Sequence, residues 1–179
     1  MRTVRYAVAV GVVLVVTAAG VADAAPGDTT TTFSVTAGTL SIAVPASAAL
    51  GSVLPGNTVT AQLGNVIVTD ARALLTAAWT ASVVSTSFKT GGGTAPETIA
   101  TSAVSYWSGA AVSTTGTATF TPGQATAGAA QTLASSRTAF TATAGVGNNT
   151  ADWNPTLVVA VPAGAVGGTY TGTVTHSVA

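Results

Sequence analysis

The side chains that could carry acid–base or nucleophilic chemistry are few in this sequence of 179 residues. Charged residues make up only 6% of it, cysteine is absent, and the single histidine is His176. His176 could in principle join a serine and one of two carboxylates, Asp70 or Asp152, in a catalytic triad. A triad needs its nucleophile on a strained turn, and the G-x-S-x-G pattern that makes one does not occur. We therefore interpret His176 as a half-buried packing residue of a strand.

One short motif matches part of a catalytic set. Lys89-Thr90-Gly91 has the K-T-G triplet of the serine enzymes that recognise penicillin. Those enzymes also need an S-x-x-K nucleophile, whereas Ser85 lies four residues before Lys89 instead of three. The glycines at 91–93 lack the G-K-[ST] that completes a phosphate-binding loop. The sequence thus predicts no enzyme and no catalytic residue.

The same composition excludes several classes of ligand. Without cysteine there is no thiol nucleophile, no Cys-ligated zinc and no iron–sulfur cluster. One histidine and a few scattered carboxylates do not make a zinc or calcium site, so we predict no metal and no cofactor. Five basic residues balance five acidic ones, and no basic stripe exists to bind nucleic acid.

Two of the rare charges lie close together in the sequence. Asp70 and Arg72 are two residues apart, and in extended backbone such residues share one face of the strand. Charges this rare are expected to have a defined place. The spacing predicts a structural ion pair that pins a loop, in preference to a binding role.

Four aromatic residues are candidates for contact with a glycan. Trp79 lies on a predicted strand and is most simply part of the core. Tyr106 and Trp107 are consecutive, so one of them should face outward if both are in a strand. Trp153 lies in a turn-rich stretch, as a lid on the core or as an exposed ring. An exposed aromatic ring in a nearly uncharged protein would offer a stacking surface for sugars.

The elements that position these residues are predicted to be strands, because the apolar residues recur with a period of two. This alternation is clear at residues 33–37 and again at 157–161. Residues 71–78 could form one helical turn capped by Asp70. Short strands separated by Gly and Pro turns, with no long helix, favour a single antiparallel β-sandwich of immunoglobulin-like or Greek-key type.

The first residues have the pattern of a secretory signal peptide. Arg2 and Arg5 form a positive start, an apolar run follows, and Ala22-Asp23-Ala24 is an A-x-A cleavage site. We predict cleavage after Ala24, with a retained membrane anchor as the alternative. The predicted division is a signal peptide at 1–24, a flexible lead-in at 25–32 and the β-sandwich domain at 33–179.

Five stretches in order, together with Arg72, carry a family resemblance: residues 63–70, 79–83, 153–157, 161–164 and 168–175. Together they resemble the WxL domain of Gram-positive surface proteins. The resemblance implies a secreted β-rich domain that peptidoglycan holds non-covalently on the cell wall. The first W-x-L motif reads Trp79-Thr80-Ala81, and the second is absent because His176-Ser177-Val178 stands in its place. The resemblance therefore implies wall binding only for Trp79.

The predicted function is a non-catalytic, extracellular domain associated with the cell wall, whose partners are wall glycan or other surface proteins. The alternative is a self-assembling subunit of a surface layer, coat or fibre. Edge strands are usually guarded against pairing by charged residues. This chain has one lysine, Lys89, and its Thr-rich strands could add to one another.

Overall fold

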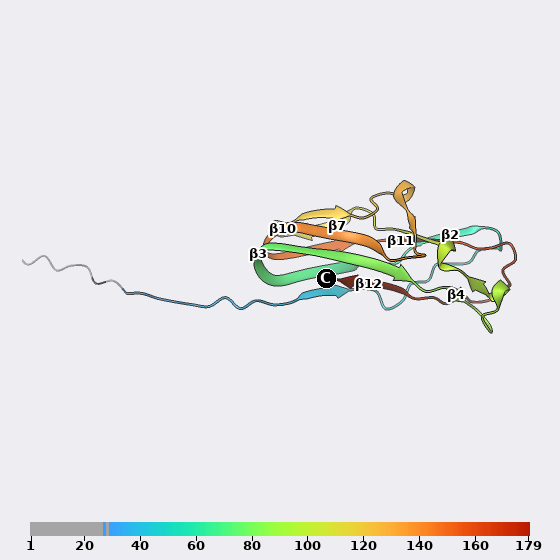
Figure 1. Cartoon of the computed structure of the whole chain (residues 1–179), viewed down its shortest axis with the longest axis horizontal. Coiled ribbons are helices and arrows are strands. Elements are labelled where there is room, and N and C mark those ends of the chain that lie inside the picture. The colour runs from blue at the N-terminus through green and yellow to red at the C-terminus, as the bar shows by residue number, and fades with distance from the viewer. Residues whose placement is uncertain (1–26, 28) are drawn as a thin grey trace, which may run out of the picture. The chain divides into compact units, whose positions relative to one another are not determined.

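The computed structural model describes Gly27 and residues 29–179 (Figure 1). The predicted signal peptide and its cleavage site at Ala24 lie outside the described residues. The chain divides into two units, Met1–Ser34 and Val35–Ala179. Every strand and helical turn of the described residues belongs to the second unit.

Residues 29–37, called the N-terminal segment below, have no regular secondary structure. Phe33 is 90% exposed and Val35 is 77% exposed. The alternation at residues 33–37 predicts a strand, but the structure has none there. A strand forms only where a partner strand accepts its hydrogen bonds, and this segment has no such partner within the described residues.

The described residues form strands of very different length and three single turns of 3₁₀ helix. The strands are β1 (Leu40–Ala43), β2 (Thr58–Gln62), β3 (Val66–Ser85), β4 (Phe88–Lys89), β5 (Thr98–Ile99), β6 (Val104–Trp107), β7 (Ala111–Thr115), β8 (Thr119–Pro122), β9 (Gln131–Thr132), β10 (Arg137–Trp153), β11 (Thr156–Ala160) and β12 (Val174–Val178). The helical turns are η1 (Ala95–Glu97), η2 (Thr101–Ala103) and η3 (Ala127–Ala129).

The two long strands, β3 and β10, are the centre of the largest sheet. They pair antiparallel with each other along most of their length. The first part of β3 also pairs with β1, and its last part pairs with β12. In the same way β10 pairs first with β8 and then with β7. Each long strand is therefore shared between two sets of neighbours.

Both long strands bend near their middle, and Figure 1 shows β3 turning back on itself. Ala73 in β3 and Ala144 in β10 have φ of 53° and 55°, in the left-handed region that residues with a Cβ rarely occupy. The buried positions of β3 change from even numbers before the bend to odd numbers after it. The predicted helical turn at 71–78 is therefore wrong, because these residues continue the strand through the bend.

The bend makes the two halves of the sheet face each other across a common core. Phe140, from the first half of β10, stacks on Trp153 from its second half, with ring centroids 4.8 Å apart. Val68 and Val83, from the two halves of β3, are both buried in this core. The structure confirms the prediction of an all-β fold with antiparallel sheets packed as a sandwich.

A second sheet, in the order β2-β11-β6-β9, continues the sandwich, and β4 and β5 form a short separate hairpin. Tyr106 of β6 and Leu157 of β11 enter the same core. Two segments without strands, residues 44–55 and 165–173, lie between β1 and β2 and between β11 and β12. These two segments form the walls of the groove described below.

Candidate functional site

Three of the four aromatic candidates are buried. Trp79 is 3% exposed, and Tyr106 and Trp153 are fully buried. A buried ring has no face to offer a sugar, so the prediction of a glycan contact is wrong for these three residues. Trp107 is partly exposed because it follows Tyr106 in β6 and so faces the other side of the sheet.

Asp70 and Arg72 form an ion pair at the bend of β3. The Arg72 Nε and Nη2 atoms donate to the two oxygens of the Asp70 carboxylate, each at 2.8 Å. Arg72 Nη2 also donates to the carbonyl oxygen of Ala78 at 2.8 Å. The guanidinium therefore ties the two arms of the bend together. Its hydrogen bonds to the buried carboxylate hold the pKa of Asp70 below its usual value.

A short polar chain crosses the core and ends at the single histidine. Trp153 Nε1 donates to the Tyr106 hydroxyl at 3.3 Å, and that hydroxyl lies 3.1 Å from His176 Nε2. A phenol that accepts from Trp153 has its proton free to donate, and the His176 tautomer with Nε2 unprotonated accepts that proton. Burial lowers the pKa of His176 to about 4 and raises the pKa of Tyr106 above its ordinary value.

The residues of the K-T-G triplet lie in a hairpin. Lys89 is exposed in β4 and exchanges backbone hydrogen bonds with Thr171. Gly91 and Gly93 have positive φ in the turn that follows. The carboxylate of Glu97 accepts hydrogen bonds from the Thr94 hydroxyl and backbone N–H, which lower the pKa of Glu97. This arrangement shapes a turn at the end of the hairpin.

Metal-binding clusters and membrane-spanning helices are both absent from the described residues. Within them, no group of three or more His, Cys, Asp or Glu side chains lies close enough to hold a metal ion. Also within them, no helix has the length and apolar character needed to cross a membrane.

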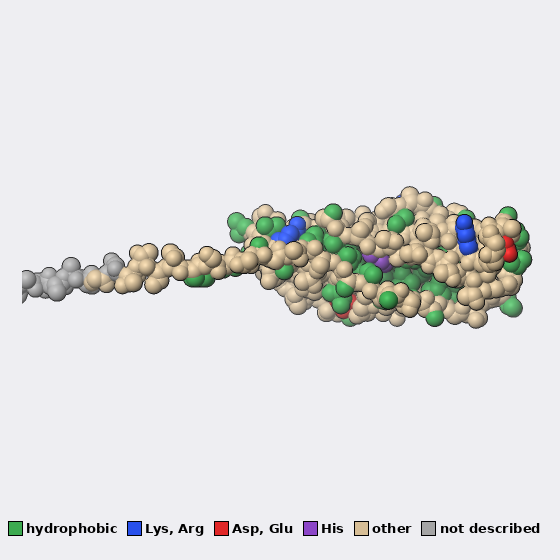
Figure 2. All heavy atoms as spheres, turned by 90° about the horizontal axis from the view of Figure 1, so that it is seen from below, with side chains coloured by type: hydrophobic (Ala, Val, Ile, Leu, Met, Phe, Trp, Pro, Cys, Tyr) green, Lys and Arg blue, Asp and Glu red, His purple; other side chains and the backbone are tan. Residues whose placement is uncertain are grey.

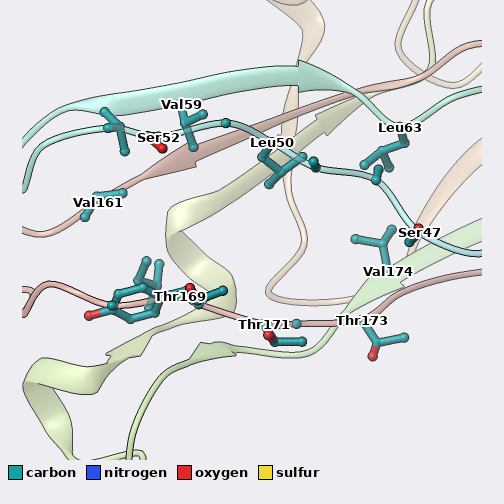
Figure 3. Close-up of a pocket in the computed structure, with 18 of the residues that line it drawn as sticks. Ser47, Leu50, Ser52, Val59, Leu63, Val161, Thr169, Thr171, Thr173 and Val174 are labelled. Atoms are coloured by element: carbon teal, nitrogen blue, oxygen red, sulfur yellow. The ribbon is translucent and has the colours of Figure 1, made fainter.

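A groove of about 870 Å³ opens in the β-sandwich unit. One wall is the 44–55 segment and the other is residues 165–174, as the close-up in Figure 3 shows. On the face in Figure 2, apolar side chains gather in the hollow beside the histidine. The floor and ends of the groove include Val59, Leu63, Val66, Ile99, Val161 and His176.

The side chains along the second wall alternate between the groove and the solvent. Val174 points into the space between the two walls, towards the segment that carries Leu50, whereas Thr173 points away from it (Figure 3). Thr171 and Thr175 are exposed in the same way as Thr173. The groove is therefore apolar inside and has a hydroxyl-rich outer surface along this wall.

The backbone along this wall has a free edge. Ala179 and Thr80 exchange both of their backbone hydrogen bonds, and so do Thr171 and Lys89. In an antiparallel pair, residues that alternate with these point their N–H and C=O groups to the other side. Tyr170, Gly172, Val174 and His176 are the alternating residues. Their backbone groups form no hydrogen bonds to another strand among the described residues.

The opposite wall also has unused backbone groups. Residues 46–53 form no strand, and no backbone hydrogen bond of the described residues involves them. Sequence patterns did not reveal the groove, because a local pattern does not show which backbone groups stay unpaired. The signal that could have revealed one wall is the Thr/apolar alternation at residues 169–178. This alternation predicts a strand, but it does not show that one edge of the strand is free.

Comparison with protein-family models, with curated proteins and with solved structures gave no match for this chain. The resemblance to the WxL domain therefore stays a prediction.

Proposed function

We propose that this chain is a non-catalytic, secreted cell-surface domain that binds an extended polypeptide strand in its groove. The observation that carries the proposal is the free edge of residues 170–176 beside an apolar floor. Strand addition uses these two features together, since the edge supplies main-chain hydrogen bonds and the floor accepts alternate side chains. Secretion rests on the signal-peptide pattern of residues 1–24.

The non-catalytic character is supported by how the reactive groups are used. His176 bonds the phenol of Tyr106, where a triad would need a carboxylate and a serine. The Asp70 carboxylate is neutralised by Arg72. Both arrangements hold the fold together and leave no acid–base pair directed at the groove.

The preferred ligand follows from the lining of the groove. A strand that pairs with residues 170–176 would turn every second side chain onto Leu50 and Val174, which favours apolar side chains there. Its other side chains would lie beside exposed threonines, which suits polar residues. No charged residue occurs between residues 165 and 179, so recognition depends on short-range contacts.

Peptide binding to residues 38–179, which lack the N-terminal segment, tests this function. The probes are uncharged nine-residue peptides that alternate Thr with Val, Leu or Phe, and the readout is amide hydrogen exchange. We expect slower exchange at Gly172, Val174 and His176. Control peptides of the same composition, with their apolar residues placed consecutively, should not slow it. If none of the alternating peptides protects these amides, the groove does not bind strands.

Wall glycan is a second candidate ligand, and the partial exposure of Trp107 is what favours it. Retention of residues 25–179 on purified peptidoglycan is the test, with Trp107→Ala as the variant. Loss of retention in this variant, with retention of a Val112→Ala control, would support stacking on Trp107. Absence of retention of the unaltered chain would argue against wall binding.

A further inference from the structure

We infer that the strand bound in the groove is the N-terminal segment of a second copy of this chain. The inference rests on the proposed function and names the partner of the same site. One copy would insert residues 31–37 along residues 170–176 of the next. The two features that meet in this contact are both present in a single chain, and neither has a partner strand among the described residues.

The N-terminal segment has the side-chain pattern of a strand with one buried face. Thr31, Phe33, Val35 and Ala37 would lie on one face, and the residues between them are Thr32, Ser34 and Thr36. Phe33 and Val35 are nevertheless 90% and 77% exposed. Burying a large apolar side chain is favourable, so this segment gains most from a site that accepts alternate apolar residues.

The acceptor edge has the complementary properties. From Tyr170 to His176 it is seven residues long, which equals the length from Thr31 to Ala37. Natural edge strands are commonly protected by lysine, proline or a bulge. No charged residue or proline occurs between residues 165 and 179. The N-terminal segment is also uncharged from residue 29 to residue 37, so no repulsion opposes the pairing.

The geometry of this contact determines the kind of assembly. Each copy has one donor, residues 31–37, and one acceptor, residues 170–176, and these are different surfaces. A contact between different surfaces is head-to-tail and leaves a free donor at one end and a free acceptor at the other. Repeated in one direction, such a contact builds an open fibre or a ring, and reciprocal exchange between two copies is the smallest closed form.

Two half-competent variants, one that keeps only the acceptor and one that keeps only the donor, test the contact in solution. Residues 38–179 keep the acceptor and lack the donor, and the compact unit retains all its strands without residues 29–37. Val174→Lys in residues 25–179 keeps the donor and places a charge in the groove. We expect unaltered residues 25–179 to form oligomers that grow with concentration in light scattering. Each half-competent variant alone should be monomeric, and their mixture should form a 1:1 complex.

Matched substitutions separate the contact from general effects on folding. Phe33→Ser with Val35→Ser should weaken assembly by at least about tenfold, because it removes the apolar face of the donor. Thr32→Ser with Thr36→Ser alters the opposite face of the same segment and should leave assembly within about twofold. Val112→Lys introduces the same charge as Val174→Lys at an exposed valine of β7 and should assemble normally.

Three outcomes would overturn the inference. Residues 25–179 could stay monomeric at millimolar concentration, residues 38–179 could assemble as well as the longer chain, or Val112→Lys could block assembly as Val174→Lys does. A synthetic peptide of residues 29–37 distinguishes this failure from failure of the proposed function. If that peptide leaves the Val174 amide unprotected while other alternating peptides protect it, the groove binds strands but not this one.

Discussion

Asp70 shows how much one ion pair contributes to stability in a chain with so few charges. Its carboxylate is fully buried and has Arg72 as its ionic partner, which is itself 29% exposed. Removing one member of a buried pair costs about 3–5 kcal/mol, and the partial exposure of Arg72 reduces this figure. The pair therefore contributes to stability at the bend and not to a binding surface.

We predict that Arg72→Ala lowers the free energy of unfolding by about 2–4 kcal/mol, because it leaves a buried carboxylate without a counter-charge. Urea denaturation of residues 38–179 measures this change. Lys89→Ala is the control, since Lys89 is an exposed cation with no ion pair among the described residues, and its effect should stay within about 0.5 kcal/mol. Equal effects of the two substitutions would contradict the role of the pair.

His176 is predicted to make stability depend on pH. The unfolded histidine binds a proton below about pH 6.5, whereas the folded one binds it only near pH 4. Between these values the unfolded state holds more protons, so the free energy of unfolding falls as the pH falls. The loss should reach at most about 3 kcal/mol near pH 4.

The control for this pH dependence is His176→Gln, which can still accept a hydrogen bond from Tyr106 but does not titrate. Its stability should be flatter between pH 6.5 and 4. Asp70 and Glu97 have pKa values lowered from 3.8 and 4.5, so their contributions begin to be lost as the pH falls through these values, and they affect both proteins equally. The prediction fails if both proteins show the same slope above pH 4.

The residue scale also shows what a sequence pattern leaves open. The two-residue spacing of Asp70 and Arg72 predicts an ion pair from local geometry alone. The aromatic residues cannot be placed in this way, because burial of Trp153 depends on Phe140 reaching it from the other layer of the sandwich. A local pattern contains no information on which distant ring will cover a side chain.

At the scale of elements, the bend of the long strands is the decisive feature. Ala73 and Ala144 occupy the left-handed region, where an alanine is strained and a glycine is not. The register between β3 and β10 shifts around both residues. The two layers of the sandwich therefore come from continuous strands that fold over, and not from separate strands joined by loops.

Glycine at these two positions is predicted to stabilise the protein. Ala73→Gly and Ala144→Gly should each raise the free energy of unfolding by about 0.5–1 kcal/mol, because they relieve the strained φ. Ala160→Gly, at an exposed alanine of β11 without a positive φ, should lower it by a similar amount. Thermal and urea denaturation both measure these changes. A loss of stability in all three variants would contradict the assigned strain.

The elements also show where the two-residue alternation of apolar side chains fails to predict a strand. Residues 157–161 alternate and all but Val161 lie in β11, whereas residues 33–37 alternate and form no strand. Residues 71–78 lose the alternation because the strand bends there, which made them resemble a helical turn. Alternation therefore records which face a strand would bury, and whether the strand forms depends on a partner far away in the sequence.

At the scale of the whole molecule, the scarcity of charge predicts how assembly responds to salt. Neither the donor residues 31–37 nor the acceptor residues 170–176 carry a charge other than the titratable His176. We expect the association constant to change by less than about threefold between 50 mM and 500 mM sodium chloride, because screening acts on charges. Sedimentation equilibrium measures it. A much larger decrease with salt would point to ion pairs in the interface.

The sequence by itself determined the chemical limits of this protein. The absence of cysteine, the near absence of charge and the alternation of threonine with apolar residues were enough to predict an all-β sandwich without an obvious catalytic centre. These properties are local, because composition and strand periodicity are read from neighbouring residues.

Only the tertiary structure decided which strand edge is free. Strand pairing joins residues such as Arg137 and Val83, or Ala179 and Thr80, that are far apart in the chain. The free edge at residues 170–176 is visible only once all such pairs are known. Hydrogen bonds between distant strands are set by the whole fold, and this is the physical reason why the groove and the exposed N-terminal segment could not be predicted from the sequence.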